Sequence, residues 1–152
     1  MPKSTDTFSL NPDFYIHAFD ALPKALVVLD NECKLRYFNT EAARLFCLVP
    51  PNHLGLDFGK AIHCREAESN SKEPAHQLIC SNCRFEKSVS AAMRTKGRQD
   101  KSSMVMRLNR NNGEVLRLIQ FESAFFNSGN IDYIIIVFDD LTETGEKAVS
   151  LT

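Results

Sequence analysis

The sequence lacks the features that mark membrane, secreted and nucleic-acid-binding proteins. The longest apolar run, Tyr133 to Phe138, is far too short to cross a bilayer, and the N-terminus MPKSTDTFSL has no apolar stretch typical of a signal peptide. With 18 Lys and Arg against 19 Asp and Glu, the formal net charge is −1. This balance gives no electrostatic basis for binding nucleic acid or an anionic membrane. We therefore expect a soluble cytoplasmic protein without membrane insertion.

Motifs of the common catalytic sites are also missing. The chain has no phosphate-binding glycine loop and no H-E-x-x-H zinc motif. His63 stands beside Cys64, but neighbours in sequence rarely point at each other, and no orienting third residue or oxyanion-hole motif accompanies them. The sequence therefore predicts that this domain is not an enzyme.

What the chain does contain is enough apolar material for one core. It has 152 residues, of which 43% are hydrophobic and 11 are Phe, and this length favours one domain over two. Residues 1–10 are mostly polar, so we expect a flexible N-terminus. We expect residues 11–143 to form a single domain and residues 144–152 to form a C-terminal exit segment or linker.

The first half of the domain predicts a helix, a hairpin and a second helix. Asn-Pro-Asp at 11–13 is typical of a helix start, and this helix should continue from Pro12 to Ala21. ALVVLDNECKLRYF at 25–38 has two apolar runs around a short polar turn, which indicates a β-hairpin. Asn39 and Thr40 can cap a helix through Phe46, which we expect Pro50 and Pro51 to stop.

The second half predicts an irregular segment, a long helix and three strands. Residues 52–75 have no periodicity, and such segments often carry function. Helical spacing from Leu78 onward, with Gly97 as the expected C-terminal cap, predicts a helix of about five turns that is the longest element. The expected strands are Met104–Leu108, Val115–Phe126 and Ile131–Asp140, the first two joined by the turn Asn111-Asn112-Gly113.

The strand 115–126 is apolar on both faces. Leu116 and Leu118 point one way, whereas Ile119 and Phe121 point the other. One face should contact the core, and the other must be covered by the N-terminal helix or by a second copy of the chain. We therefore expect a homodimer formed through the helix 12–21 and the outer face of the sheet.

This order of elements, with these residues, resembles the PAS domain family of sensory modules. The resemblance covers about Pro12 to Glu143. It rests on ALVVLDNECKLRYFN, on RNNGEVLRL and above all on VFDDLTE, which is similar to the closing D-[IL]-T-E signature of the family. It implies an α+β fold in which a five-stranded antiparallel sheet carries helices on one face that enclose a ligand-sized space. It identifies no ligand, because the fold hosts many.

The resemblance also implies a function. In PAS domains the closing signature commonly leads into a helical linker to a histidine kinase, a nucleotide cyclase or another PAS domain. The chain is then an intracellular sensory module of the bacterial two-component kind, with any catalytic output outside it. It would sense a small ligand or redox state and relay it through dimerisation and the C-terminal exit, where Asp139, Asp140 and Thr142 lie. The alternative is a structural interaction module without a cofactor.

The cysteines are the main candidates for site chemistry. They number five, an odd count that favours thiols or metal ligands over a disulfide framework. Cys80-x-x-Cys83 would place two sulfurs on adjacent ridges at the start of the long helix, and Cys64 lies across the irregular loop. Soft thiolates at such spacing suit zinc or an iron–sulfur cluster. A subset of bacterial PAS domains is similar here but has a further loop cysteine, so His76 or His63 would have to be the fourth ligand.

Other interpretations of the same residues stay open. Cysteines on an apolar helix face can be ordinary packing or a reversible thiol switch, and Cys33 and Cys47 favour structural roles. N-C-R-F at 82–85 matches part of the motif of flavin-binding relatives, but it falls on the later helix, and the last strand lacks their glutamine, which argues against flavin. Haem would need a histidine on the long helix, whereas His76 favours a surface or capping role. With or without metal, we expect the three loop and helix cysteines to lie close together.

Overall fold

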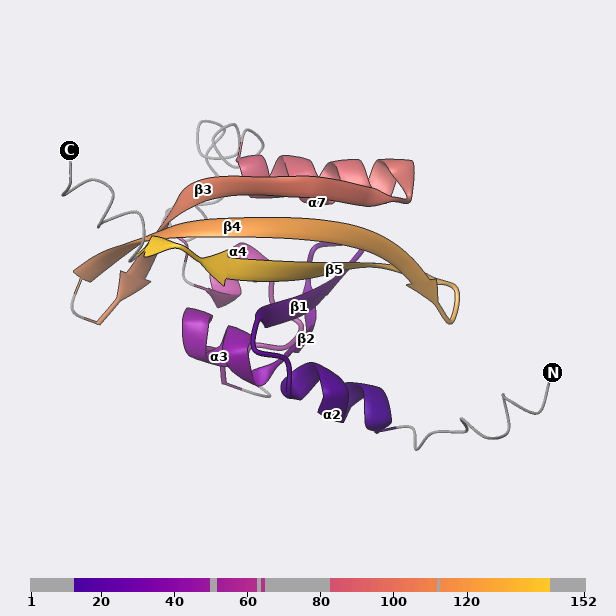
Figure 1. The fold of residues 1–152 in the computed structure, drawn as a ribbon, viewed down its shortest axis with the longest axis horizontal. Coiled ribbons are helices and arrows are strands. Elements are labelled where there is room, and N and C mark those ends of the chain that lie inside the picture. Colours follow the sequence, from indigo (N-terminus) through magenta and orange to yellow (C-terminus); the bar gives the residue numbers. More distant parts are fainter. Residues whose placement is uncertain (1–12, 50–51, 63, 65–82, 112, 143–152) are drawn as a thin grey trace.

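The computed structural model describes residues 13–49, 52–62, 64, 83–111 and 113–142. Its elements, coloured along the chain in Figure 1, are a short N-terminal helix, a hairpin, two short helices, a longer helix and three long strands. In chain order they are α2 (Phe14–Asp20), β1 (Ala25–Asp30), β2 (Leu35–Phe38), α3 (Thr40–Phe46), α4 (Phe58–Ala61), α7 (Arg84–Thr95), β3 (Arg98–Arg110), β4 (Gly113–Ser128) and β5 (Ile131–Asp140).

The five strands form one antiparallel sheet in the order β2-β1-β5-β4-β3. β1 and β5 are central strands, and β2 and β3 are the edges. All six residues of β1 are buried, which explains why this segment is a continuous apolar run rather than an alternating one. The predicted α+β class, with a five-stranded antiparallel sheet and an N-terminal helix, is therefore confirmed.

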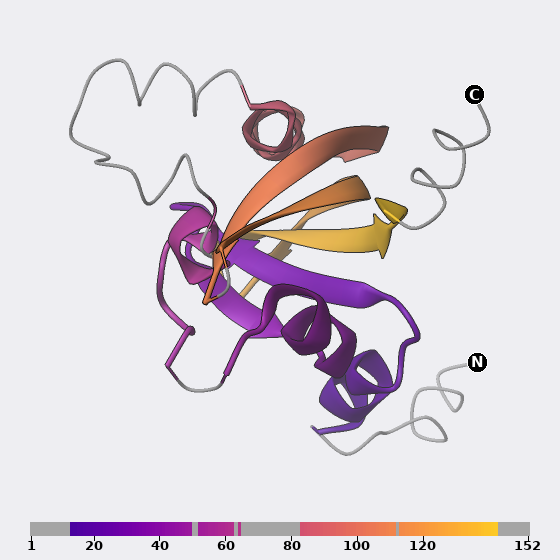
Figure 2. The same ribbon diagram turned by 90° about the vertical axis from the view of Figure 1, so that its left-hand side faces the viewer.

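The two faces of the sheet differ in what covers them. On β4, Ile119 and Phe121 are buried whereas Leu116 is 52% exposed, so the predicted split between the faces is correct. The helices α3, α4 and α7 bury their apolar residues against the inner face. Figures 1 and 2 show the ribbons of these helices beside the sheet. α7 does so with a residue every three or four positions, as expected for an amphipathic helix.

Aromatic rings fill the layer between the sheet and these helices. Five phenylalanines from five different elements contact one another there, with ring centroids 5.0 to 6.4 Å apart, and they are Phe46, Phe58, Phe85, Phe121 and Phe138. All five are buried. Ring pairs of this kind add about 0.5–1.5 kcal/mol each beyond the area that they bury. These rings occupy the layer where the resemblance to PAS domains implied a ligand-sized space.

Asn39 connects the N-terminal helix to the rest of the domain. Its Oδ1 accepts hydrogen bonds from the N–H groups of Ala42 (3.0 Å) and Leu26 (2.9 Å), so it caps α3 as predicted and also holds β1. Its Nδ2 donates to the carbonyls of Phe19 (2.9 Å) and Lys24 (2.8 Å), at the end of α2 and in the segment that follows. One buried amide thereby joins three elements.

α2 lies against the outer side of the hairpin and is itself largely exposed. The ring of Phe19 contacts Tyr37, and the Tyr37 hydroxyl donates to the Asp20 carboxylate at 2.7 Å. Burial, followed by this carboxylate, raises the pKa of Tyr37. Tyr37 pairs with Val28 and therefore lies on the face opposite the core. No residue of α2 is buried, and its apolar residues Phe14, Tyr15 and Ile16 are exposed.

Several predicted boundaries were wrong. Cys83 is extended and α7 begins at Arg84, so its 12 residues make it shorter than the predicted five-turn helix and shorter than the 16-residue β4. The left-handed residue that ends it is Lys96, not Gly97. α3 ends at Phe46 because Cys47 adopts a left-handed conformation, with φ 58°, before the two prolines are reached.

The predicted strand ends differ as well. β3 begins at Arg98, six residues before the predicted start at Met104. The extra residues, RQDKSS, are polar and gave no strand signal, but an edge strand tolerates such residues because one side of it faces water. β4 begins at Gly113 and ends at Ser128, two residues beyond the predicted strand at each end. The predicted cap at Asn11 and Pro12 lies outside the described residues.

Candidate functional site

The end of β5 is tied to β4 by the residues of the closing signature. The Leu141 N–H donates to the Leu118 carbonyl at 2.8 Å, and the Leu118 N–H donates to Oγ1 of Thr142 at 2.9 Å. The Asp140 carboxylate accepts from the Thr142 N–H at 3.0 Å and also from its hydroxyl. The Asp-x-Thr spacing thus has a physical reason: the carboxylate orients the hydroxyl, which then receives the free N–H of the neighbouring strand.

Asp139 faces a different element. Its Oδ2 lies 3.0 Å from Nζ of Lys24, in the segment between α2 and β1. The two side chains border a surface hollow of about 450 Å³ between α3, β4 and the end of β5, where charges of both signs meet. Its charged lining residues are Lys24, Arg44, Arg117, Glu41, Asp139 and Asp140. The structure therefore joins Asp140 to Thr142, whereas Asp139 pairs with Lys24, which the sequence did not single out.

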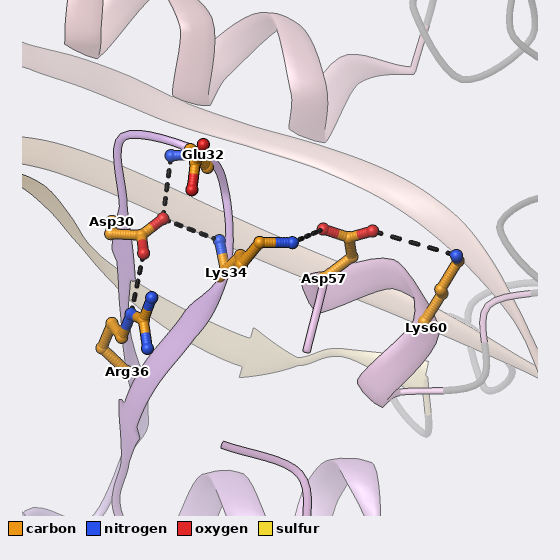
Figure 3. A network of polar contacts seen from close by, with 6 residues as sticks. All are labelled: Asp30, Glu32, Lys34, Arg36, Asp57 and Lys60. Atoms are coloured by element: carbon orange, nitrogen blue, oxygen red, sulfur yellow. Dashed lines mark hydrogen bonds and ion pairs between the residues drawn. The ribbon is translucent and has the colours of Figure 1, made fainter. Parts of the chain in front are cut away.

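A second polar network surrounds the β1–β2 turn (Figure 3). Asp30 is buried, and its carboxylate accepts hydrogen bonds from the N–H groups of Glu32 (2.8 Å) and Lys34 (3.1 Å) and from Nε of Arg36 (2.7 Å). Burial alone would raise the pKa of Asp30, but the hydrogen bonds and the guanidinium outweigh it and hold the pKa below its usual value. The network fixes the turn as a rigid unit.

The same turn is attached to α4. Nζ of Lys34 lies 3.1 Å from Asp57, which is also 4.0 Å from Nζ of Lys60, as Figure 3 shows. The Cys33 carbonyl accepts from the Phe58 N–H at 3.1 Å. Glu86, in the first turn of α7, lies close enough to Asp57 for the two carboxylates to repel. Burial and then Asp57 raise the pKa of Glu86.

Cys33 lies among these carboxylates with its side chain against the core. Burial, followed by the charges of Glu86, Asp30 and Asp57, raises the pKa of the Cys33 thiol to about 11. The thiol therefore stays protonated at neutral pH, which makes it a poor nucleophile and a poor metal ligand. Its backbone is left-handed, with φ 61°, because the turn bends there.

Two of the four predicted metal ligands are described, and both lie against β3. Cys64 forms an isolated bridge with Leu108, and Sγ of Cys83 lies 3.7 Å from Sδ of Met104. The two contacted positions are four residues apart, about 13 Å along a strand. Cys80 and His76 lie outside the described residues, as does the alternative ligand His63. Within the part of the chain that the structure describes, no three His, Cys, Asp or Glu residues are grouped to hold a metal ion.

The comparisons with known proteins give the fold. No protein-family model matches the chain, and no curated protein matches it by sequence. Solved structures do match. The PAS domain of Bordetella pertussis BvgS has a TM-score of 0.60 at 18% identity, over 91% of this chain and 92% of that one. A PAS domain from a two-component sensor histidine kinase has a TM-score of 0.56 at 10% identity, over 90% of this chain and 98% of that one.

A third match points the same way. The PAS domain of nitrogen regulation protein NR(II) from Vibrio parahaemolyticus has a TM-score of 0.56 at 9% identity, over 84% of this chain and 97% of that one. The chain therefore has the PAS fold, and the resemblance drawn from the sequence is confirmed at the level of the fold. Among the described residues, no helix is long and apolar enough to span a bilayer.

Proposed function

We propose that the chain is an intracellular sensory module of a signal-transduction protein, whose signal leaves through the end of β5. The observation that supports this most is the hydrogen bond from Leu118 to Thr142, which couples the exit to the neighbouring strand β4. β5 is a central strand that contributes buried residues to the aromatic core, so a change in the core is passed on along it. A signal passed on by two alternative arrangements of the end of β5 needs no catalytic residue in the domain.

The experiment is a domain exchange. Residues 1–152 replace the PAS domain of a sensor histidine kinase, and autophosphorylation is measured with Thr142, with Thr142→Val and with Thr142→Ser as the matched control that keeps the hydroxyl. We expect the Val variant to change the basal kinase activity and the Ser variant to resemble the parent. Equal activity in all three chimeras would remove the support for this route.

We further propose that the module works as a homodimer. α2 exposes Phe14, Tyr15 and Ile16 at 45%, 58% and 47%, and the outer sheet face exposes Val105 and Leu116 at 53% and 52%. Such apolar area is typical of a surface covered in an assembly. Sedimentation equilibrium of the intact chain, and of a chain lacking residues 1–22, tests this. A monomer at high concentration would contradict it.

For the input, a small ligand, a redox change and a metal on Cys64, Cys80, Cys83 and His76 remain alternatives. Metal analysis and an absorbance spectrum of anaerobically purified protein distinguish them, because zinc is spectroscopically silent whereas an iron–sulfur cluster absorbs visible light. Loss of the metal in a Cys80→Ser, Cys83→Ser variant that still folds would locate it. A chain without metal and without any ligand-induced change in melting temperature would favour the interaction module without a cofactor.

A further inference from the structure

Positive charge is concentrated on one surface of the domain, formed by α7 and the first part of β3. Eighteen consecutive residues carry six cations and only two carboxylates, Glu86 and Asp100, although the whole chain has a net charge of −1. The six cations, here called the basic ridge, are Arg84, Lys87, Arg94, Lys96, Arg98 and Lys101, and all of them are exposed. The even charge balance of the whole sequence concealed this surface.

The cations of the basic ridge are not neutralised within the part of the chain that the structure describes. The ion pairs found there use other cations, namely Lys24, Lys34, Arg36, Arg44 and Lys60. Among the ion pairs of the described residues, a carboxylate of a binding partner would therefore have none to displace on the ridge. Unpaired like charges that are held on neighbouring elements also raise the local potential and attract anions from solution.

The ridge borders a hollow between α7 and β3. It has a volume of about 900 Å³. Four of the six cations line it, together with three serines and with both carboxylates of this stretch, Glu86 and Asp100, so cations outnumber carboxylates there by four to two. In Figures 1 and 2, α7 runs beside β3 along the edge of the sheet. The hollow, here called the groove, therefore has residues of a helix on one side and of an edge strand on the other.

The edge strand β3 indicates which class of anionic molecule the groove binds. β3 pairs with β4 on one side, with a register shift between Gln99 and Ser102, and on its other side the only backbone pairing among the described residues is the Cys64 bridge at Leu108, near its far end. Nη1 of Arg84 donates to the Ser103 carbonyl at 3.0 Å, so this carbonyl is accessible from this side, and a strand that paired with it would replace the Arg84 contact. Such an edge is a template for another strand, which only a polypeptide can supply.

We propose that the groove binds an extended, acidic segment of a partner protein. The segment adds a strand to the β3 edge next to residues 98–103, and its carboxylates face the basic ridge. The backbone hydrogen bonds supply the affinity, and the charges select an acidic partner and accelerate its association. This surface lies apart from the exit residues and from α2, so it does not depend on the sensory function proposed above.

The probe is a fluorescein-labelled peptide of alternating Glu and Thr residues, and fluorescence anisotropy with the intact chain measures its binding at low and at physiological salt. We expect binding that weakens with salt and falls at least about tenfold in the Lys87→Glu, Arg94→Glu variant, because two attractive contacts become repulsive. Lys60→Glu, Arg44→Glu is the matched control, since it reverses two helical charges outside the groove, and it should bind within about twofold of the parent. Circular dichroism confirms that both variants are folded.

A second peptide tests the strand. The same sequence with alternate backbone nitrogens methylated keeps every carboxylate but cannot pair along a strand edge, so we expect it to lose binding. Equal binding of the methylated peptide would overturn the edge-strand proposal. Tighter binding of a single-stranded oligodeoxythymidine than of the peptide, or no peptide binding at low salt, would overturn it as well.

Discussion

Lys24 and Asp139 form an ion pair, with 3.0 Å between Nζ and Oδ2, although Lys24 precedes the first strand and Asp139 is the second-last residue of the last strand. It joins the segment that follows α2 to the exit of β5. The side chains are 50% and 32% exposed, so water screens the attraction, and the pair contributes only about 0–1 kcal/mol to stability. The main effect of the pair is to hold the segment after α2 next to the end of β5.

Breaking this pair should therefore have little effect on the free energy of unfolding. We expect Lys24→Met and Asp139→Asn each to alter the free energy of unfolding by less than about 1 kcal/mol, and their combination to show a small coupling energy in a double-mutant cycle. Urea denaturation measures both, and high salt should remove the difference from the parent. A loss of several kcal/mol would mean that the pair is structural.

Removing the Thr142 hydroxyl should release the exit from β4. In Thr142→Val the Leu118 N–H loses its acceptor, which costs about 1 kcal/mol. We expect faster hydrogen exchange at the Leu118 amide, measured by NMR, whereas Thr142→Ser should keep the protection of the parent. Unchanged exchange in the Val variant would show that the Leu118 amide is protected by another group.

Substitution of Asn39 should destabilise the protein more than substitution of most other polar residues. Asn39→Ala removes a helix cap and leaves buried partners on α2, β1 and α3 unsatisfied, so we expect a loss of about 3 kcal/mol or more. Asn39→Ser keeps a capping oxygen but cannot donate to both carbonyls, and it should recover only part of this loss. Thermal denaturation compares the three proteins, and a fully stable Ser variant would show that the bonds to α2 contribute little.

The partly buried carboxylate of Glu86 should make stability depend on pH. Because its pKa is raised in the folded state, the carboxyl is protonated in both states below its unfolded pKa and costs nothing there. As the pH rises through the folded pKa, the folded state must hold a charge that the unfolded chain exposes to water, and stability is lost. We therefore expect Glu86→Gln to stabilise the protein at pH 7 and to have no effect at about pH 3.

The control for this experiment is Glu122→Gln, which changes an exposed residue of β4. It should leave the pH dependence of unfolding as it is in the parent. Urea denaturation at a series of pH values measures the free energy for all three proteins. A Glu86→Gln variant that is less stable than the parent at pH 7 would contradict the assignment, because it would show that the charged form makes a favourable contact.

The cysteines should differ in reactivity. Cys47 is exposed, whereas burial and three nearby carboxylates raise the pKa of the Cys33 thiol to about 11. Since the thiolate is the reactive form, iodoacetamide at neutral pH should modify Cys47 well before Cys33. Mass spectrometry of digests taken over time gives the order, and the unfolded protein in urea is the control, in which the difference should disappear. Equal rates in the folded protein would place Cys33 at the surface.

Local sequence patterns predicted most of the fold because the residues in them form the elements that such patterns favour. The two apolar runs of the first hairpin became β1 and β2, and Asn39 caps α3 through the very oxygen that made it a predicted cap. The start of β3 could not be predicted, because its polar residues are held in the sheet by pairing with Ser123 and Ala124, far along the chain. The start of α7 was predicted wrongly because apolar residues at helical spacing do not show that the backbone of Cys83 is extended.

The candidate site was predictable only where it is local. Asp140 and Thr142 were visible as a short motif, but their partner Leu118 lies on another strand, and Lys24 meets Asp139 only through the sheet order. The basic ridge went unseen because the overall charge of the sequence hides a local excess. The prediction that Cys64, Cys80 and Cys83 share a site stays a prediction, since Cys80 and His76 lie outside the described residues.

The phenylalanine cluster determines how the domain would respond to a guest molecule. Each of the five rings belongs to a different element, namely α3, α4, α7, β4 and β5, and the rings contact one another directly. A molecule entering this layer has to displace rings, and a close-packed interior transmits such a displacement to its neighbours. A ligand that bound in this layer would therefore also shift the helices and strands that carry the rings.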